Sequence, residues 1–332
     1  MRYFIVNGVV PSYDGFSTRL GGSTDLITRK KAYKTLGLAI PKLGERFIYR
    51  LDRMGSFSVL TYDVDQSNLI IKSRSQKNAY CLANSFRAVL GVYFGLFIPW
   101  QRHDWLLYEL SRSPSNVTTF KELTSLIKPM TDYERLSEMD LRVSLGSGCG
   151  LFDEQLIWSC QFIGHLQKSH DRFLQAMLHL LHSHYILPND MTGSYYEFHY
   201  SRDRKEESTN LRMKRRFEAQ IEYDLAFLSA FRAIESLLKC NNWKGRSIDL
   251  LIRQFDKKMG TSFAKTKYEC FHVIFSGWKK YWNYAEIIDK FLLMRNSVAA
   301  HSPLKRAYSL NEDHVYEIQY FVQTMISDAL LD

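Results

Sequence analysis

The sequence predicts an α+β protein in which a small N-terminal part of mixed strands and helices precedes a helical C-terminal part. Residues 1–75 contain short β-prone runs that end in Gly, Ser or Asp, a pattern typical of strands and turns. Beyond residue 151, nearly every hydrophobic pattern has the period of an α-helix. The chain of 332 residues exceeds one typical domain. We therefore predict two domains, at 1–150 and 151–332, divided at the glycine-rich stretch 144–150.

The N-terminal domain is expected to contain a small sheet followed by helices. The clearest strand patterns are "RFIYRLD", "FSVLTYDVD" and "NLIIKSR", at 46–52, 57–65 and 68–74. From Gln76 a helical pattern runs to residue 97 and stops before Pro99. A second helix is predicted over "DWLLYELS", at 104–111. We expect this domain to sense a trigger, restrain the other domain or recruit a partner.

The C-terminal domain is expected to be an all-α bundle with one charged insertion. The insertion, residues 188–210, is aromatic at first and then highly charged, so we expect it to be solvated and mobile. The basic stretch "RMKRRF" follows it, and Arg212, Lys214, Arg215 and Arg216 are candidate nucleic-acid-binding residues. The predicted helices lie at 153–167, 171–186, 222–240, 247–259, 283–301 and 313–331.

Composition narrows the class of protein. A net charge of +9 and a pI near 9.1 favour a polyanionic partner such as nucleic acid. The cysteines are odd in number and scattered without a CxxC pair, which argues against a disulfide framework and a structural zinc site. The chain start has no secretory-signal pattern, and no apolar stretch is long enough to cross a bilayer. We expect a cytoplasmic protein that does not contact a membrane.

One charged residue lies within an apolar helical face. In the helix predicted at 283–301, Arg295 falls in the middle of a stripe that includes Phe291 and Val298. A buried guanidinium must be paired or must reach a wet cleft, because an unpaired buried charge costs several kcal/mol. Glu235 lies in the same way on the apolar face of the helix at 222–240, and we predict that it pairs with Arg295.

Two interpretations of Arg295 remain open, and they differ in the role of His301. In the first, Arg295 and Glu235 form a structural ion pair that fixes how the helices pack. In the second, His301 turns toward Arg295 at the end of the helix, because Ser302 precedes Pro303 and is disfavoured in the helical conformation. The histidine and the arginine would then share one site.

The stretch "RNSVAAH" resembles the signature of HEPN-domain ribonucleases, in which an Arg, a polar residue and a His occur at this separation. "FLSAFRAIESLLKC", at 227–240, resembles the glutamate-bearing helix of the Apea-like branch of that family. The resemblance covers roughly residues 155–332. A second pair with suitable spacing, Arg172 with His179, lies on a face that carries Gln175, His182 and Ser183, so we interpret it as a solvated stripe.

The resemblance implies a HEPN-like helical bundle that pairs into a homodimer and cleaves RNA with neither a catalytic metal nor a cofactor. RNA supplies the nucleophile, its 2′-hydroxyl, so cleavage needs an acid, a base and positive charge on the phosphate. His301 can be acid or base, Arg295 can hold a phosphate oxygen, and Asn296 can orient either group. A 2′,3′-cyclic phosphate product, and a role in antiphage defence or as a toxin, are further implications.

The sequence departs from some HEPN relatives at one position, and it leaves one rival function open. A tyrosine shortly after the histidine is a modification target in some relatives, whereas here Tyr308 lies seven residues beyond His301. The rival is a non-catalytic dimeric HEPN-like module that binds RNA or a protein, in which Arg295 is only the structural partner of Glu235. Both functions keep the predicted homodimer.

Overall fold

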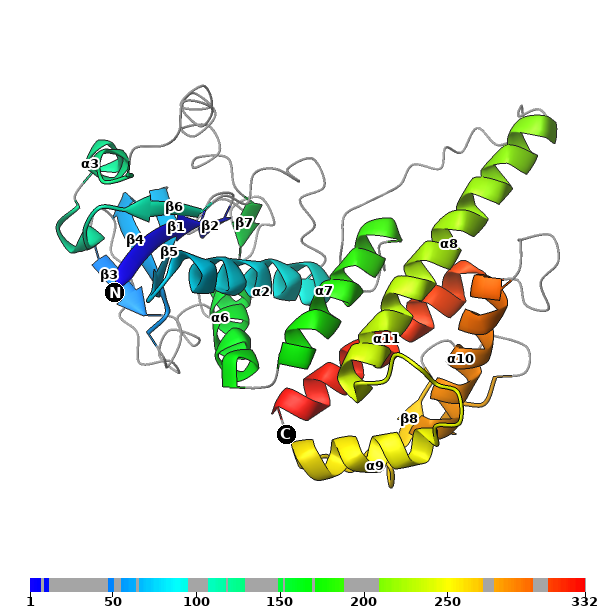
Figure 1. The fold of residues 1–332 in the computed structure, drawn as a ribbon. Helices are drawn as coiled ribbons and strands as arrows, with labels where there is room; N and C mark the ends of the chain where they lie inside the picture. The colour runs from blue at the N-terminus through cyan, green and yellow to red at the C-terminus, as the bar shows by residue number, and fades with distance from the viewer. Residues whose placement is uncertain are drawn as a thin grey trace, which may run out of the picture. The chain divides into compact units, whose positions relative to one another are not determined.

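The protein is a mixed α+β chain, mostly helical with a small antiparallel sheet, as the sequence predicts (Figure 1). This computed structural model describes residues 1–6, 9–11, 47–50, 55–63, 66–94, 107–117, 119–128, 149–151, 153–168, 171–187, 209–270, 278–300 and 310–331. The described residues form two compact units. The first contains those up to Leu90 and from Leu107 to Gly164, and the second contains Gly91–Phe94 and those from His165 onward.

The first unit is built on an antiparallel sheet with the strand order β3-β4-β5-β1-β6. The three predicted strands are confirmed as β3, β4 and β5, which pair as neighbours in that order. β1, which the sequence patterns did not predict, lies between β5 and β6. The strands span Arg2–Val6 (β1), Phe47–Arg50 (β3), Phe57–Asp63 (β4), Gln66–Ser73 (β5) and Leu107–Leu110 (β6).

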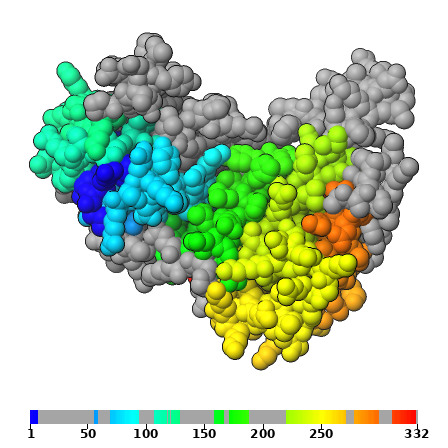
Figure 2. Space-filling view, in the orientation of Figure 1, coloured from blue at the N-terminus to red at the C-terminus, as the bar shows by residue number. Residues whose placement is uncertain are grey.

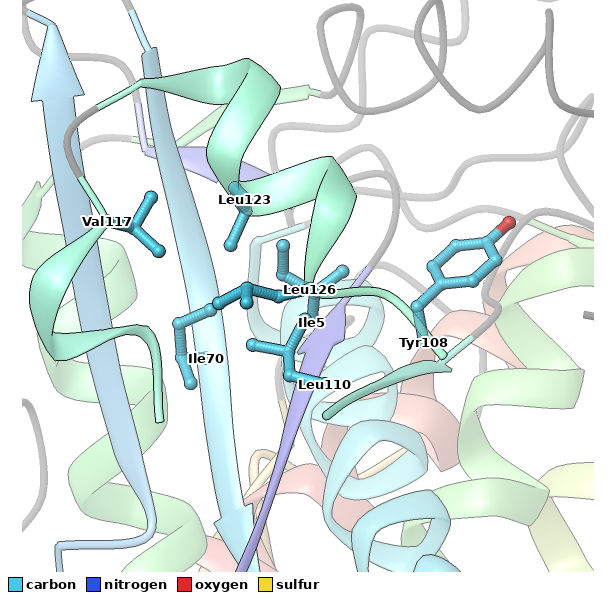
Figure 3. Close-up of a cluster of buried hydrophobic side chains, with 7 residues drawn as sticks. All are labelled: Ile5, Ile70, Tyr108, Leu110, Val117, Leu123 and Leu126. Carbon is cyan, nitrogen blue, oxygen red and sulfur yellow. The ribbon is translucent and has the colours of Figure 1, made fainter. Parts of the chain in front are cut away.

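Both faces of this sheet are covered by helices, because apolar residues occupy successive positions on β1 and β5. On one face, Phe57 lies 6.0 Å from Phe86 of α2 (Gln76–Phe94), measured between ring centroids. On the other, Ile5 packs with residues of α3 (Phe120–Ser125) and its flanks, near a 3-10 helix at Pro114–Asn116. Figure 3 shows this second cluster, which consists of Ile5, Ile70, Tyr108, Leu110, Val117, Leu123 and Leu126.

The prediction of a helix at 104–111 is wrong, because residues 107–110 form strand β6. β6 pairs with β1, and Tyr108 lies opposite Ile5 on the face that α3 covers. An apolar run this short fits a helix or a strand equally well, so its partner decides the outcome. A parallel pair formed by β2 (Val9–Pro11) and β7 (Cys149–Leu151) was also not predicted.

The helices of the C-terminal half follow the hydrophobic pattern closely. They are α6 (Asp153–Lys168), α7 (Asp171–Ile186), α8 (Thr209–Leu238), α9 (Ile248–Met259), α10 (Tyr284–Ala300) and α11 (Glu312–Leu331). α8 begins well before the predicted residue 222, and residues 209–221 include many good helix formers. The predicted insertion therefore overlaps α8 at Thr209 and Asn210, and residues 188–208 lie outside the described residues.

Aromatic side chains fill the core of the second unit. Phe291 of α10 lies 6.1 Å from Phe227 of α8 and 5.4 Å from Phe321 of α11, measured between ring centroids. A buried polar contact joins α11 to α7, since Gln319 Nε2 of α11 donates a hydrogen bond to Ser183 Oγ of α7 at 2.9 Å. The helices α7, α8, α10 and α11 thus share one core.

The prediction of a purely helical C-terminal domain is wrong at one place. β8 (Lys267–Glu269) and β9 (Tyr281–Asn283) form an antiparallel pair in which Tyr268 lies opposite Trp282. Tyr268 is 2% exposed and donates a hydrogen bond to Glu317 Oε1 of α11 at 2.6 Å. Three-residue strands are too short to give a period, so only this packing reveals them. Among the described helices, none is long and apolar enough to span a membrane.

Candidate functional site

Helix α10 positions Arg295 near its C-terminal end. The helix buries Ile287, Ile288 and Phe291 in the core of the second unit, and this burial fixes the face it presents. Arg295 follows Phe291 by one turn, and its side chain is 34% exposed. It therefore lies at the edge of the apolar stripe, not in the middle as the helical wheel predicts. Its guanidinium is partly desolvated and still reaches solvent.

Three neighbours surround the Arg295 guanidinium. Its Nη2 lies 3.6 Å from Glu235 Oε1 of α8. Its Nη1 donates a hydrogen bond to Asn296 Oδ1 at 3.1 Å. The ring centroid of Phe231 lies 6.0 Å from the guanidinium carbon, which is within cation–π range. The structure thus brings together Arg295, Asn296 and Glu235, three of the residues singled out in the sequence.

Trp243 completes this group, and the sequence patterns missed it. Its indole Nε1 donates a hydrogen bond to Glu235 Oε1 at 3.0 Å, and its ring lies 5.6 Å from that of Phe231. The Glu235 side chain, 15% exposed, therefore contacts two donors at once. A tryptophan just after a helix end is a weak signal, although a buried indole N–H usually needs an acceptor.

A thiol lies beside this group without joining its chemistry. Cys240 Sγ donates to the Asn242 carbonyl oxygen at 3.4 Å, and desolvation raises the pKa of the thiol. The nearby Glu235 charge also raises this pKa, while hydrogen bonding with the Asn242 backbone and the charge of Arg246 lower it. A thiol with a raised pKa is a poor nucleophile at neutral pH. The polar chemistry of the site therefore rests on Arg295, Asn296 and Glu235.

The structure describes the other predicted site residues only in part or not at all. α10 ends at Ala300, and His301, the next residue of the chain, lies outside the described residues. Its role as acid or base stays a prediction. The candidate nucleic-acid-binding residues all lie on the first turns of α8, where the structure describes the backbone: Arg212, Lys214, Arg215 and Arg216.

The interpretation of the Arg172 face as a solvated stripe is wrong for Arg172 and Ser183, which are buried. Arg172 is 7% exposed, and Ser183 is fully buried and donates a hydrogen bond to the Ala226 carbonyl oxygen at 2.8 Å. Gln175 and His182 on the same face are exposed, as expected. The reason is that α7 packs against both α8 and α11, so more of its circumference is buried than one apolar stripe indicates. The buried Arg172 guanidinium donates from Nη1 to the Leu237 carbonyl oxygen near the end of α8, at 2.9 Å.

Helix α7 carries three histidines, His179, His182 and His184, a residue type that can bind metal ions. Desolvation, followed by the charges of Arg232 and His182, lowers the pKa of His179, and burial lowers the pKa of His184 to about 3. Within the described part of the chain, no group of three or more His, Cys, Asp or Glu side chains is arranged to hold a metal ion. These histidines therefore supply no metal site that the structure describes.

Comparison of the chain with protein-family models, with curated proteins and with solved structures finds no match.

Replacing Glu235 by alanine is expected to lower the free energy of unfolding by about 1–2 kcal/mol, because Arg295 loses its ion-pair partner and Trp243 loses its hydrogen-bond acceptor. The partial exposure of Arg295 keeps the loss below that of a fully buried pair. Urea unfolding monitored by circular dichroism measures the change. Glu235→Gln is the matched control: it keeps an acceptor for Trp243 and should lose about half as much. Equal stability of all three proteins would show that the pair contributes nothing.

Proposed function

We propose that this protein is a metal-independent RNA endonuclease whose helical half is HEPN-like, with Arg295 and His301 as its catalytic residues. One observation carries the proposal. The guanidinium of Arg295 is held by Glu235 and Asn296 and remains 34% exposed, so it keeps N–H donors for a ligand. An arginine with a purely structural role gains nothing from this exposure. A phosphate-binding arginine requires it.

The chemistry follows from the residue types. The 2′-hydroxyl of RNA attacks the adjacent phosphorus, the bond to the leaving 5′-oxygen breaks, and a 2′,3′-cyclic phosphate forms. His301 removes the proton of the 2′-hydroxyl or delivers one to the leaving oxygen. Arg295 donates to a non-bridging oxygen as negative charge accumulates there. Glu235 acts through Arg295, since it restrains the guanidinium and does not touch the RNA.

The proposed enzyme is a homodimer, because one histidine serves as either acid or base and the complete reaction needs both. The resemblance to HEPN ribonucleases implies that α10 of each protomer contributes to one shared cleft. The net charge of +9 suits an RNA substrate.

In solution the wild-type protein is expected to have close to twice the 39.0 kDa mass of one chain. Replacing Leu293 by glutamate should leave this mass unchanged, because Leu293 lies about 200° around α10 from Arg295 and so away from the surface proposed to pair. Light scattering across a micromolar concentration range measures both. Leu250→Glu, at a comparably exposed position on α9, should leave the dimer intact. A wild-type mass of one chain at every concentration would contradict the shared cleft.

A second function is favoured by the contact between Arg295 and Glu235. Their separation of 3.6 Å also suits a non-catalytic dimeric module that binds RNA or a protein and in which the pair only fixes helix packing. Incubation of the purified protein with total RNA in EDTA distinguishes the two functions. The enzyme cuts the RNA under these conditions, whereas the module leaves it intact.

A further inference from the structure

The segment between α8 and α9, residues 239–247, which we call the α8–α9 loop, contains three basic residues and no acidic one. The basic residues are Lys239, Lys244 and Arg246, and all three are exposed. Within the described part of the chain, neither Lys244 nor Arg246 forms an ion pair with an acid. In Figure 2 this part of the second unit, from the end of α8 through α9, is the yellow surface. The loop therefore presents positive charge to solvent.

Trp243 anchors the α8–α9 loop to the candidate site. Its indole Nε1 donates to Glu235 Oε1 at 3.0 Å, and the same oxygen lies 3.6 Å from Arg295 Nη2. Its ring lies 5.6 Å from that of Phe231, and the guanidinium carbon of Arg295 lies 6.0 Å from the Phe231 ring centroid. Trp243 and Arg295 thus share one carboxylate and one aromatic neighbour. The residues that follow Trp243 in the chain therefore lie at the edge of the Arg295 site.

A hydrogen-bonded turn holds the two cations that follow Trp243. The backbone N–H of Arg246 donates to the Trp243 carbonyl oxygen at 3.1 Å, which closes a β-turn over residues 243–246. Gly245, the third residue of this turn, has a φ of +69°, which glycine adopts without strain. Asn242 Oδ1 accepts a hydrogen bond from the Lys244 backbone N–H at 3.1 Å. The backbone of Lys244 and Arg246 is therefore fixed beside the site.

The helix ends that flank the loop act differently on its charges. Arg246 precedes Ser247, the N-cap of α9, and the partial positive charge of a helix N-terminus adds to that of the arginine. Lys239 follows the C-terminal end of α8, whose partial negative charge disfavours an anion. The first acid of α9, Asp249, is already paired with Arg253 at 2.8 Å. The part of the loop that suits an anion is thus the turn at residues 243–246.

We propose that this turn binds single-stranded RNA beside the Arg295 site, with Lys244 and Arg246 holding phosphates next to the one at Arg295. The inference rests on the proposed nuclease function and adds the residues that position its substrate. An ammonium and a guanidinium both suit phosphate oxygens. The partly exposed Trp243 ring lies beside them, and aromatic rings next to basic residues are typical of proteins that bind single strands. Contacts to the phosphate backbone carry no sequence preference.

Binding of a fluorescent 2′-O-methylated single-stranded RNA by the full-length protein tests the turn. The modification blocks attack by the 2′-hydroxyl, so affinity is measured whether or not the protein cleaves RNA. Combining Lys244→Gln with Arg246→Gln should weaken binding about tenfold at low salt, because two phosphate contacts are lost. The slope of log affinity against log salt should become shallower by roughly 1.4.

The matched control removes the same charge elsewhere on the same helix. Lys257→Gln combined with Lys258→Gln changes two exposed lysines at the opposite end of α9 from the turn. At physiological ionic strength this control should bind within about twofold of wild type, because charges beyond a Debye length are screened. Equal weakening by the control and the turn variant would show that only the net charge matters, which contradicts a site at the turn.

The steady-state kinetics of a cleavable RNA separate substrate binding from chemistry. The turn variant should raise KM about tenfold and leave kcat within about twofold of wild type, because contacts made equally in the ground state and the transition state affect only binding. Its urea unfolding midpoint should not change, since both side chains are exposed. A fall in kcat with an unchanged KM would contradict a role in substrate binding.

Failure of the turn proposal can be told apart from failure of the nuclease proposal. Binding that depends on Lys244 and Arg246, by a protein that leaves cleavable RNA intact, would support the turn and exclude the nuclease. Cleavage by wild type, with the same affinity and KM in the turn variant, would overturn the turn and leave the nuclease standing. No binding of the single strand by wild type, or tighter binding of a duplex of the same sequence, would also overturn it.

Discussion

Replacing His301 by alanine is expected to lower the rate of RNA cleavage by roughly 100- to 10,000-fold, the usual contribution of a general acid or base. Arg295→Ala should have an effect of similar size, because it removes the positive charge that stabilises the phosphate in the transition state. EDTA should change neither the wild-type rate nor the residual rates. Cleavage of a fluorescent RNA by purified protein measures each rate, and a cyclic phosphate at the new 3′ end identifies the reaction.

The same set of purified proteins provides controls for misfolding of the variants and for contaminating ribonuclease. His301 directly follows the last residue of α10, so His301→Ala should change the free energy of unfolding by about 1 kcal/mol or less. His182→Ala removes an exposed histidine of the same helical half and should cleave RNA at the wild-type rate. Cleavage by His301→Ala at the wild-type rate would exclude this histidine from the chemistry. Intact RNA with wild type under every condition would favour the interaction module.

Replacing Phe291 by alanine is expected to lower the free energy of unfolding of the helical half by about 3–5 kcal/mol. Phe291 is fully buried and its ring lies within 6.1 Å of the rings of Phe227, Trp278 and Phe321, measured between centroids. Its loss removes buried apolar surface and leaves a cavity among helices α8, α10 and α11. Urea unfolding followed by circular dichroism measures the loss.

Leu225→Ala is the matched control for this prediction. Leu225 lies on α8 and is 50% exposed, so its truncation should change the free energy of unfolding by about 0.5 kcal/mol or less. Equal losses for the two variants would mean that the aromatic cluster does not stabilise the helical half. Phe291 lies on the same helix as Arg295 but in the core. The Phe291→Ala variant should therefore lose RNA cleavage only under conditions in which the helical half is unfolded.

The elements that the sequence predicts well are those whose own residues determine them. α7 has the predicted bounds, and α9, α10 and α11 agree with theirs to within a residue, because each carries a complete apolar stripe. Strand β6 was assigned as a helix because its conformation depends on β1, roughly a hundred residues away in the chain. Local pattern contains no information about such a partner.

The candidate site was likewise predictable from the sequence only in part. A helical wheel identifies Arg295 and Glu235 as charges on apolar faces, and the two lie 3.6 Å apart between Nη2 and Oε1. Their exposure and the contribution of Trp243 could not be predicted, because both depend on how the segment after α8 packs against Phe231. Arg172 was misjudged for a related reason: a wheel describes one face, while α7 contacts both α8 and α11.

The position of Trp243 makes the candidate site observable by spectroscopy. Its indole donates to the same carboxylate oxygen that approaches Arg295, so its electronic environment depends on that guanidinium. Labelling the chain with 5-fluorotryptophan yields one fluorine resonance for each of its 6 tryptophans, and the spectrum of a Trp243→Phe variant identifies the one from this position. Occupancy of Arg295 can then be followed in the intact protein, with no label on the RNA and independently of any turnover.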